Sequence, residues 1–417
     1  MIRRPIAISL SPNTETDDVL LALNTLLKPG VWFNKEEVEK LETEFSQLFG
    51  KGYKALAINS GRSAEFLILK ALGLGPNDEV AIQALTCIAV PNSVLWCRAK
   101  PLYIDVDESF NMDFNNLSEK LSEKTKAIIV QHSFGIPAHV EKIKKVTQLR
   151  KITLIEDCSL ALGATYFGRQ VGTLGDVAFF SFGRDKVISS VFGGVILVKN
   201  DGLYNKIKAE RDRLTNPALS WVVQQLFHPL AMSIVLPLYN VGLGKATLGK
   251  LLLFVFQRLG FLSKAVYDEE KNGRRPDIFP TLMPGALAVL ARRQLSKLVK
   301  FNRRRQEIVA LYQNKLGKTN LTLPLGSSGA IWVRYPITVE NRNKLFNFFK
   351  RKGVLIGDWY TGVVVPVIDP TLVGYKVGSC PKAEGYSEKL LNLPTYPSMS
   401  ISDAQKVVDI VKEYEKL

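Results

Sequence analysis

The stretch Ile152–Lys199, ITLIEDCSLALGATYFGRQVGTLGDVAFFSFGRDKVISSVFGGVILVK, decides the fold. It contains two β-rich runs, Thr153–Glu156 and Val177–Phe182, and a third apolar run, Val195–Val198, which follows a pair of glycines. Each of the first two runs ends in an abrupt change to Gly, Asp and Ser, which is typical of strands that deliver polar side chains to the carboxyl edge of a sheet. The stretch therefore predicts neighbouring strands of a buried α/β sheet with a functional site at one edge.

Three polar side chains stand where these strands are predicted to end. Asp157 directly follows the first run, Ser181 lies near the end of the second, and Lys186 comes five residues after Ser181. A lysine at such an edge can act as a nucleophile once it loses its proton, which requires partial desolvation or neighbouring positive charge. The structural alternatives are a lysine exposed in a loop and an aspartate that only caps a helix.

The rest of the chain alternates strands with helices. The strands predicted before residue 140 are separated by helical stretches, which is the order of a mostly parallel sheet with helices on both faces; they are Tyr53–Asn59, Glu79–Gln83, Pro101–Asp105 and Ala127–Gln131. After residue 297, three further strands between helices predict a second, smaller α/β domain; they are Ala330–Val339, Gly353–Gly357 and Leu390–Tyr396.

These motifs resemble the fold-type I pyridoxal 5'-phosphate (PLP) enzymes, and within them the DegT/StrS family of sugar aminotransferases. The family pattern runs from I-E-D through spaced glycines and F-S-F to a lysine and G-G. This chain matches it at Ile155-Glu156-Asp157, Gly163-Ala164, Gly168, Gly172, Gly175-Asp176, Phe180-Ser181-Phe182, Lys186 and Gly193-Gly194. The resemblance implies a large domain with a mostly parallel, seven-stranded sheet flanked by helices and a smaller C-terminal α/β domain.

The resemblance also implies a role for each polar residue at the edge. Lys186 would hold PLP as a Schiff base, Asp157 would pair with the pyridinium nitrogen, and Ser181 would bind the phosphate. A carboxylate at that nitrogen keeps it protonated, so that the ring can accept electrons from the substrate carbon. Lys186 and Asp157 are therefore the predicted catalytic residues, and no metal ligand is predicted.

A second part of the cofactor site is predicted at the start of a helix. Small residues follow the strand Tyr53–Asn59, and such a turn at a helix N-terminus presents free backbone N–H groups to a phosphate. Many α/β turns share this composition. The family has S-G-T-x-A here, so the resemblance implies that the phosphate of PLP is held by Ser60, Gly61, Arg62 and Ser63, with Arg62 in place of the usual Thr.

Three further positions depart from the family pattern. Cys87 stands where the family has an aromatic residue that stacks on the pyridine ring, Leu160 replaces a Gln or His beside the ring, and Trp359 replaces a His on the substrate side. We expect Cys87 to contact the cofactor and Trp359 to face the substrate. His132, at the end of a predicted strand, is a candidate substrate contact, and the alternative is a histidine satisfied by its own neighbours.

Composition is ordinary for a globular protein except in its charge. Of 417 residues, 46% are hydrophobic and 23% charged, but the net charge of +16 suits nucleic acid, an anionic membrane or phosphate-bearing ligands. No nucleic-acid motif is found. The four cysteines lack metal-ligand spacing and the N-terminus lacks the apolar core of a signal peptide, so we expect a cytoplasmic protein with reduced thiols and no nucleic-acid partner.

A basic, apolar insertion is predicted at 214–276. No Asp or Glu occurs from Leu214 to Tyr267, and two apolar stretches, Leu219–Leu243 and Leu248–Val266, lie within it. The first is long enough to cross a bilayer, but its glutamines, histidine and prolines argue against a span. The second has the composition of a helix in a membrane interface. Docking of 219–266 on the cytosolic face of a membrane is one interpretation, and burial in an oligomer interface is the other.

These observations divide the chain into an N-terminal segment with the large PLP-binding domain (1–213), the insertion (214–276), a connecting helix (277–296) and the small domain (297–417). We expect a homodimeric PLP-dependent aminotransferase that moves an amino group, with glutamate as donor, to a keto sugar nucleotide in glycan or polysaccharide precursor biosynthesis. The alternatives are a family enzyme with another reaction or a lipid-linked substrate, and a binding or regulatory protein that has kept only the fold.

Overall fold

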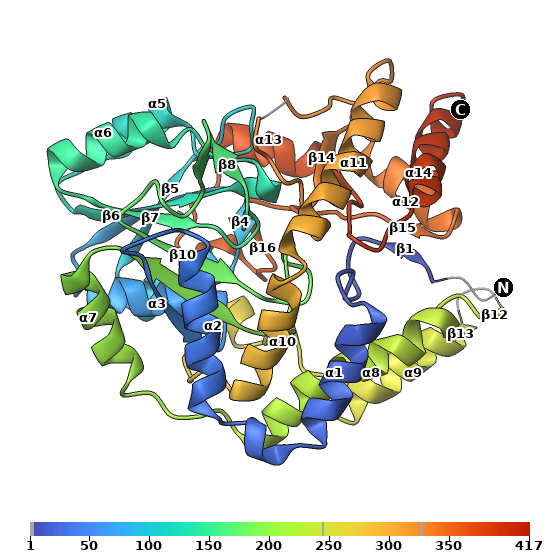
Figure 1. Ribbon diagram of the computed structural model, residues 1–417. Helices are drawn as coiled ribbons and strands as arrows, with labels where there is room; N and C mark the ends of the chain where they lie inside the picture. The colour runs from blue at the N-terminus through green and yellow to red at the C-terminus, as the bar shows by residue number, and fades with distance from the viewer. Residues whose placement is uncertain (1–3, 244–245, 326–327) are drawn as a thin grey trace.

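The computed structural model describes residues 4–243, 246–325 and 328–417. Its large domain is built on a seven-stranded sheet with the strand order β2-β11-β10-β7-β6-β3-β5 (Figure 1). β11 runs antiparallel to both of its neighbours, and the other adjacent pairs are parallel. The predicted, mostly parallel seven-stranded sheet is thus confirmed. Its strands are β2 (Lys54–Ile58), β3 (Glu79–Gln83), β5 (Lys100–Ile104), β6 (Thr125–Gln131), β7 (Thr153–Asp157), β10 (Val177–Ser181) and β11 (Gly194–Val198).

Both faces of this sheet are buried. On β11, Ile196 and Val198 belong to one hydrophobic layer, and Val195 and Leu197 belong to the other. A sheet covered on both faces has near-continuous apolar strands and meets solvent at the strand ends. The carboxyl edge is therefore where polar side chains can gather.

Helices supply the two layers that cover the sheet. α3 packs on β2, β10 and β11 in the first layer, and α2 packs on β2 in the second. Asn34 caps α2, because its side chain accepts a hydrogen bond from the Glu36 N–H at 2.8 Å. The helices of this domain are α1 (Thr16–Leu26), α2 (Lys35–Gln47), α3 (Gly61–Ala71), α4 (Ala89–Trp96), α5 (Phe114–Lys120), α6 (Val140–Arg150) and α7 (Asp201–Arg211).

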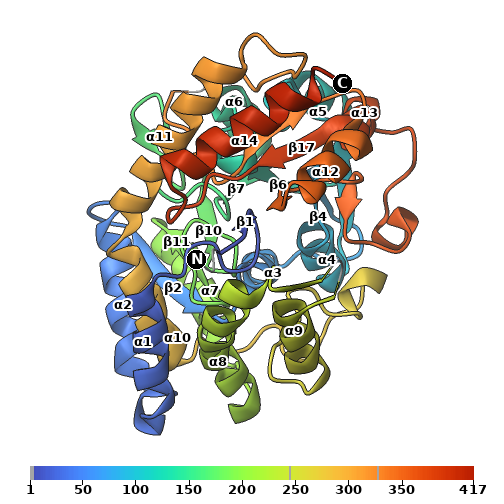
Figure 2. The ribbon, with the colours of Figure 1, turned by 90° about the vertical axis from the view of Figure 1, so that its right-hand side faces the viewer.

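The small domain follows α10 (Gly285–Leu295) and is joined to the large domain at two strand pairs (Figure 2). β1 (Ile6–Ala7) pairs with β15 (Val354–Leu355), and β4 (Thr86–Cys87) pairs with β16 (Val364–Val365). The predicted strand 330–339 is shorter in the structure, because Trp332 has φ +53°, outside the β region. The remaining elements are α11 (Leu298–Leu316), β14 (Tyr335–Thr338), α12 (Arg342–Arg351), α13 (Pro381–Lys389), β17 (Leu390–Leu393) and α14 (Ile401–Tyr414).

The apolar segment after α7 forms two helices, α8 (Leu219–Leu238) and α9 (Leu248–Arg258), which are linked by the hairpin strands β12 (Gly242–Leu243) and β13 (Ala246–Thr247). α8 lies between α1 and α9 (Figure 2). Among the described residues, α8 is the one helix that is long enough and apolar enough to cross a membrane. Half of its most apolar stretch is buried inside the protein.

The polar residues of α8 are used inside the fold. His228 Nε2 lies 2.7 Å from the Ser11 hydroxyl, and Gln225 Oε1 accepts a hydrogen bond of 2.8 Å from the Ser263 hydroxyl. Burial lowers the pKa of His228 well below its ordinary value, so the imidazole is neutral at physiological pH. α8 is therefore packed as a helix of the protein interior along one side.

Candidate active site

One pocket at the carboxyl edge of the sheet gathers the predicted site residues. It lies where β7 and β10 end beside the N-terminus of α3, and Trp359 and Tyr360 of the small domain close it from the other side. All predicted site residues except Ser63 line it. They are Ser60, Gly61, Arg62, Cys87, His132, Asp157, Ser181, Lys186 and Trp359.

The loop that carries Lys186 is held through its backbone. The Asn13 amide donates to the Lys186 carbonyl oxygen at 2.5 Å, and the Arg305 guanidinium donates to the Val187 carbonyl oxygen at 2.7 Å and to Asn13 Oδ1 at 3.0 Å. Arg305 reaches this loop from α11 and is fully buried, which lowers its pKa to about 9. The loop is fixed without using the ammonium group of Lys186.

Asp157 ends β7 on the floor of the pocket. It is 6% exposed, and its backbone lies between Gln131 of β6 and Phe179 of β10 in the sheet register. Its Oδ1 accepts a hydrogen bond of 2.9 Å from the Ser159 N–H, which fixes the orientation of the carboxylate. A buried carboxylate in this place can pair with a cationic ring nitrogen.

The N-terminus of α3 meets the end of β10 closely. Ser60 caps the helix, because its hydroxyl accepts from the Ser63 N–H at 3.2 Å. A Cβ on Gly61 would lie 2.7 Å from the Ser181 Cβ, so only glycine permits this approach. The first turn of α3 therefore presents backbone N–H groups next to the Ser181 hydroxyl. Ser63 is buried behind the turn, where its hydroxyl donates to Asn59 Oδ1 at 2.7 Å.

The guanidinium of Arg62 is turned toward the segment that follows α9. It forms an ion pair with the buried carboxylate of Glu270, donates to the Ala265 carbonyl oxygen at 2.9 Å, and lies 4.8 Å from the Phe279 ring centroid. Ala265 and Val266 line the pocket. Arg62 thus offers its backbone N–H to the pocket, while its side chain fastens residues 265–270 over it.

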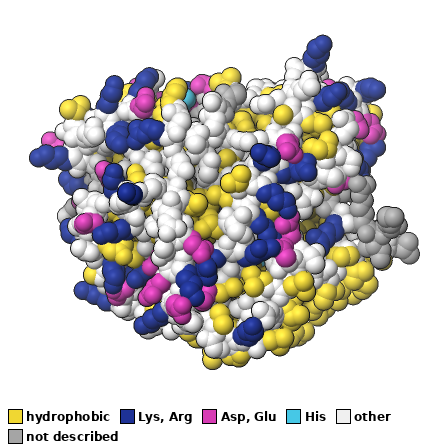
Figure 3. All heavy atoms as spheres, viewed as in Figure 1, with side chains coloured by type: hydrophobic (Ala, Val, Ile, Leu, Met, Phe, Trp, Pro, Cys, Tyr) yellow, Lys and Arg dark blue, Asp and Glu magenta, His cyan; other side chains and the backbone are white. Residues whose placement is uncertain are grey.

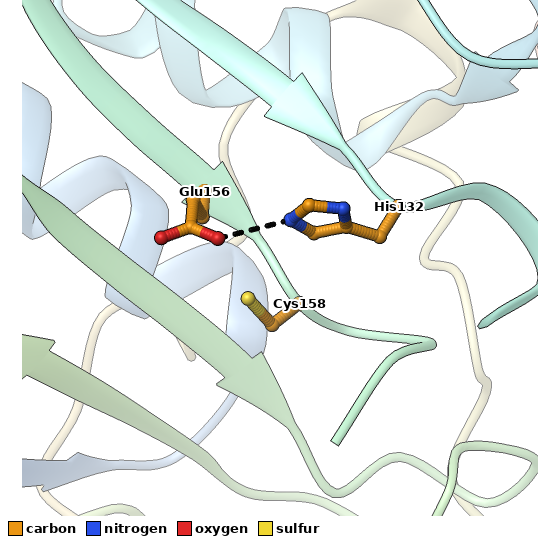
Figure 4. A group of neighbouring side chains, drawn as sticks. All are labelled: His132, Glu156 and Cys158. Carbon is orange, nitrogen blue, oxygen red and sulfur yellow. Dashed lines mark hydrogen bonds and ion pairs between the residues drawn. The ribbon is translucent and has the colours of Figure 1, made fainter. Parts of the chain in front are cut away.

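His132 lines the same pocket, and both of its ring nitrogens have protein partners, of which Figure 4 shows Glu156. Nε2 lies 3.1 Å from Glu156 Oε2, and Nδ1 accepts from the Ala138 N–H at 3.0 Å. Glu156 also accepts from the N–H groups of Gly172, Leu174 and Gly175. Hydrogen bonds within the protein thus already use the His132 and Glu156 atoms that approach the Cys158 thiol. They explain the arrangement of these three side chains without a metal ion.

The small-domain wall of the pocket is tied to the lysine loop. The Arg334 guanidinium lies 3.9 Å from the Trp359 ring centroid and forms an ion pair with Asp185, the residue before Lys186. Burial by itself would raise the pKa of Asp185, but Arg334 and Lys186 outweigh it, so the pKa lies below its ordinary value. Cys87 is half-buried on β4 and Leu160 is buried, and both line the pocket.

The chain is similar to a large group of known proteins. The family model of the DegT/DnrJ/EryC1/StrS aminotransferase family matches residues 13–260 and 279–412. The chain belongs to this family. The predicted enzyme class, a PLP-dependent aminotransferase, is thereby confirmed. The family model matches this chain through α8 and α9 and leaves out residues 261–278. These residues include 265–270, the segment that Arg62 fastens over the pocket.

Curated relatives of this family member include the spore coat polysaccharide biosynthesis protein SpsC of Bacillus subtilis, which is 28% identical over 92% of this chain and 91% of its own length. GDP-perosamine synthase of Caulobacter vibrioides is 36% identical over 52% of this chain and 57% of its own length. Among solved structures, the PLP form of the putative sugar aminotransferase Spr1654 from Streptococcus pneumoniae has a TM-score of 0.77 at 20% identity, with 99% of each chain covered. That likeness confirms the fold.

The residues present in this aminotransferase fit the phosphate and ring of PLP. The α3 N-terminus and Ser181 form a cradle that a Cβ on Gly61 would fill, and Asp157 and Lys186 lie in the same pocket. The lining residues that the sequence analysis missed include Glu65, Arg184 and Tyr360. Glu65 was signalled only by its being the one acid in the apolar run Ala64–Leu69, and the other two gave no signal of their own.

Proposed function

We propose that this aminotransferase transfers an amino group from an amino-acid donor, with glutamate expected, to the keto group of a sugar nucleotide. The observation that carries the proposal is the joint placement of Lys186, Asp157 and the α3 N-terminus in one pocket of a chain whose curated relatives are enzymes and proteins of amino-sugar and polysaccharide synthesis. The expected cellular role is the supply of precursors for a glycan or polysaccharide, in the cytoplasm.

Each residue receives one task in this proposal. Lys186 binds PLP covalently and, once released, moves the proton between the two carbons that exchange the amino group. Asp157 holds a proton on the ring nitrogen, and Ser181 with the N–H groups of Gly61 and Arg62 binds the phosphate. Bound PLP supplies the electron sink for the carbon that loses its proton.

The wall residues orient the substrate and exclude water. Phe179, Val191 and Phe192 make part of the pocket apolar, and Trp359 closes the small-domain side. Exclusion of water strengthens the charge interactions of Asp157 and Lys186. His132 is held in place by Glu156 and the Ala138 N–H, and in the proposal its ring faces the substrate side of the pocket.

A turnover screen tests the proposal. Purified holoenzyme is incubated with glutamate and a panel of keto sugar nucleotides, and amino-sugar product is measured with 2-oxoglutarate. Product from a keto sugar nucleotide, and none from the matched keto sugar without the nucleotide, is expected. Bound PLP with an amino-acid half-reaction but no product from any sugar nucleotide would leave the cofactor roles standing and overturn the substrate class.

The proposal includes a homodimer with the cofactor near the subunit boundary. Family resemblance supports it, and so does the apolar surface of α1, α8 and α9, which one chain leaves uncovered. The proposal also includes a second contact for this surface, an anionic membrane. Contact with a second subunit does not depend on lipid, whereas contact with a membrane does.

The apolar surface is formed by side chains of three adjacent helices. Figure 3 shows hydrophobic side chains gathered along the lower right edge of the molecule, where Figure 1 places α8 and α9. Phe254 is 63% and Leu251 58% exposed, although both are large and apolar. The exposed members are Leu20, Leu23 and Leu27 of α1, Leu219 and Ile234 of α8, Leu248, Leu251, Phe254 and Val255 of α9, and Leu259 and Phe261 after α9.

The charge around this surface supports lipid as its occupant. Lys28, Lys250 and Arg258 are exposed beside it, and no acidic residue occurs from Leu214 to Tyr267. An amphipathic helix with basic residues beside its apolar face lies in a bilayer interface, and each basic residue near anionic lipid contributes about 1 kcal/mol. The helix α9 has this composition, whereas α8 is held by the protein on its inner side. Flotation with anionic vesicles tests the membrane contact.

A further inference from the structure

Glu65 is a buried acid in the cofactor pocket for which the residues described above give no task. It lies in α3 one turn after Gly61 and is 1% exposed. It lines the pocket, and its neighbours along the helix are the apolar residues Ala64 and Phe66 to Leu69. The face of α3 that carries Glu65 is therefore otherwise suited to an apolar side chain.

The surroundings of Glu65 do not neutralise a negative charge. The cation nearest along its own helix, Arg62, is engaged by Glu270 and the Ala265 carbonyl. Among the described residues Glu65 Oε1 has no hydrogen-bond partner, while a side-chain hydrogen bond with Ser93 and the charge of Arg62 lower the pKa of Glu65 without outweighing burial. Asp157 of β7, Cys87 of β4 and Cys97 after α4 face it, and none of them is a cation. Burial, with the charge of Asp157 second, raises its pKa well above the ordinary value.

Two carboxyl groups that share a buried site do not both ionise, because each charge disfavours the other. Asp157 already has a hydrogen bond from the Ser159 N–H that favours its charged form. The proton of the pair therefore resides on Glu65. A buried polar atom without a partner destabilises a fold, and an apolar side chain of similar size would remove that loss. Retention of an acid here points to a partner that arrives with the ligand.

We propose that Glu65 is an additional cofactor-binding residue, an uncharged carboxylic acid that donates a hydrogen bond to bound PLP and leaves Asp157 to carry the negative charge of the pocket floor. This inference rests on the proposed cofactor chemistry and adds a donor that the family motifs do not include. In this role Glu65 would hold the ligand through an uncharged hydrogen-bond donor and would not alter the charge that faces the ring.

Two substitutions separate the donor from the charge. Glu65→Gln keeps an uncharged donor of the same shape, and Glu65→Leu keeps the volume without a donor. The measurements are the dissociation constant of PLP, obtained by refilling the cofactor-free protein, and the pH at which the absorbance band of the bound cofactor titrates. We expect the Gln variant to stay within about threefold of wild type in affinity with an unchanged titration. We expect the Leu variant to bind PLP at least tenfold more weakly with a shifted titration.

The thermal unfolding of cofactor-free protein shows whether Glu65 has a structural role instead. Glu65→Leu is expected to unfold at the same or a higher temperature than wild type, because the unpartnered oxygen is gone. A lower unfolding temperature together with unchanged PLP affinity would overturn the inference.

A downward shift of the cofactor titration in Glu65→Gln would also overturn it, because loss of a negative charge near the cofactor has that effect and Glu65 would then be ionised. If the Leu variant does not fold, infrared difference spectra of wild type and Glu65→Gln decide. A protonated carboxyl band that moves on PLP binding and is absent from the Gln variant is expected, and its absence from wild type overturns the inference. Failure of wild type to bind PLP at all would instead overturn the proposed function.

Discussion

Lys186 is the residue on which the proposed chemistry depends most. Lys186→Ala removes the amine, so borohydride should no longer fix a pyridoxyl group to the chain. Unfolding of the cofactor-free variant should stay near that of wild type, because Asn13 and Arg305 hold the loop through its backbone. Mass spectrometry of the reduced wild-type protein locates the modified residue, and a pyridoxyl group on a different lysine would contradict the assignment.

Asp157 is expected to act on rate more than on binding. Asp157→Asn should keep PLP bound through the α3 N-terminus and slow the amino-acid half-reaction about 10²–10³-fold, as is typical when a preorganised charge is removed. Stopped-flow absorbance with glutamate measures it. Asp201→Asn is the control, because Asp201 is 74% exposed at the start of α7 and should react at the wild-type rate.

Local motifs were enough to predict Asp157, Ser181 and Lys186 as site residues, because each ends or follows a short buried strand. The motifs did not predict the contacts of the Arg62 side chain, because its partner Glu270 lies 208 positions away in the sequence. Glu65 was missed for a related reason. The face of a mostly buried helix that meets a ligand is set by its packing, and Glu65 lies in the otherwise apolar run Ala64–Leu69, which does not mark one face of α3.

At the scale of elements, the Asp185–Arg334 ion pair joins the lysine loop to the small domain. Arg334 is 3% exposed, so Asp185→Asn leaves a buried guanidinium without its carboxylate and should lower the free energy of unfolding by ~3 kcal/mol. Denaturant unfolding measures this. Glu340→Gln, which breaks an exposed pair with Lys389, should change stability by less than about 1 kcal/mol. Equal effects of the two substitutions would mean that the Asp185 pair does not hold the domains.

The same ion pair predicts a dependence on pH. The pKa of Asp185 is lowered in the folded state, so its contribution is present above the unfolded pKa of about 3.9 and is lost as the pH falls through the lower folded value. Wild type and Asp185→Asn should therefore differ most at neutral pH and converge in acid. Unfolding curves between pH 2 and pH 7 measure the difference. A gap that stays constant over this range would contradict the assignment.

The exposed face of α9 should control lipid binding. Leu251→Asp with Phe254→Asp places acids in the apolar surface, which opposes both insertion and attraction to anionic lipid. Flotation with phosphatidylserine vesicles should be lost in this variant. Leu149→Asp on α6, where Leu149 is 85% exposed, is the matched control and should float like wild type. Loss of the dimer with unchanged flotation would assign the surface to the subunit interface instead.

Element positions followed from periodicity in most of the chain, and β3 was predicted at its observed bounds. The exceptions are places where backbone conformation departs from the local pattern. Residues 330–333 are apolar and look like a strand, but Trp332 has a positive φ and strand β14 begins only at Tyr335. Nothing in the side-chain pattern of that stretch distinguishes the two conformations.

At the scale of the whole molecule, the oligomeric state can be tested with cofactor occupancy. Sedimentation of the holoenzyme should show a dimer, and its PLP content should fall with the dimer on dilution if the cofactor lies near the boundary. A fully loaded monomer in mild detergent would contradict this placement.

The fold as a whole could be predicted, because regular alternation of strands and helices leaves few topologies for a buried parallel sheet. The packing of α8 on α1 could not be predicted from the sequence. Those helices are separated by about 190 positions, and an apolar helix in water, in a subunit contact or in a bilayer shows the same composition.

The segment 265–270 lies between the apolar helix α9 and the pocket at the carboxyl edge of the sheet. It follows α9, lines the pocket with Ala265 and Val266, and is fastened by Arg62, while Arg184 donates to the Ser263 carbonyl at 2.7 Å. An occupant of α9 that favoured one position of this segment would change the affinity of the pocket for PLP. Because such coupling is reciprocal, PLP would then strengthen vesicle binding by the same factor by which vesicles strengthen PLP binding. Membrane binding by this enzyme and retention of its coenzyme would therefore depend on each other.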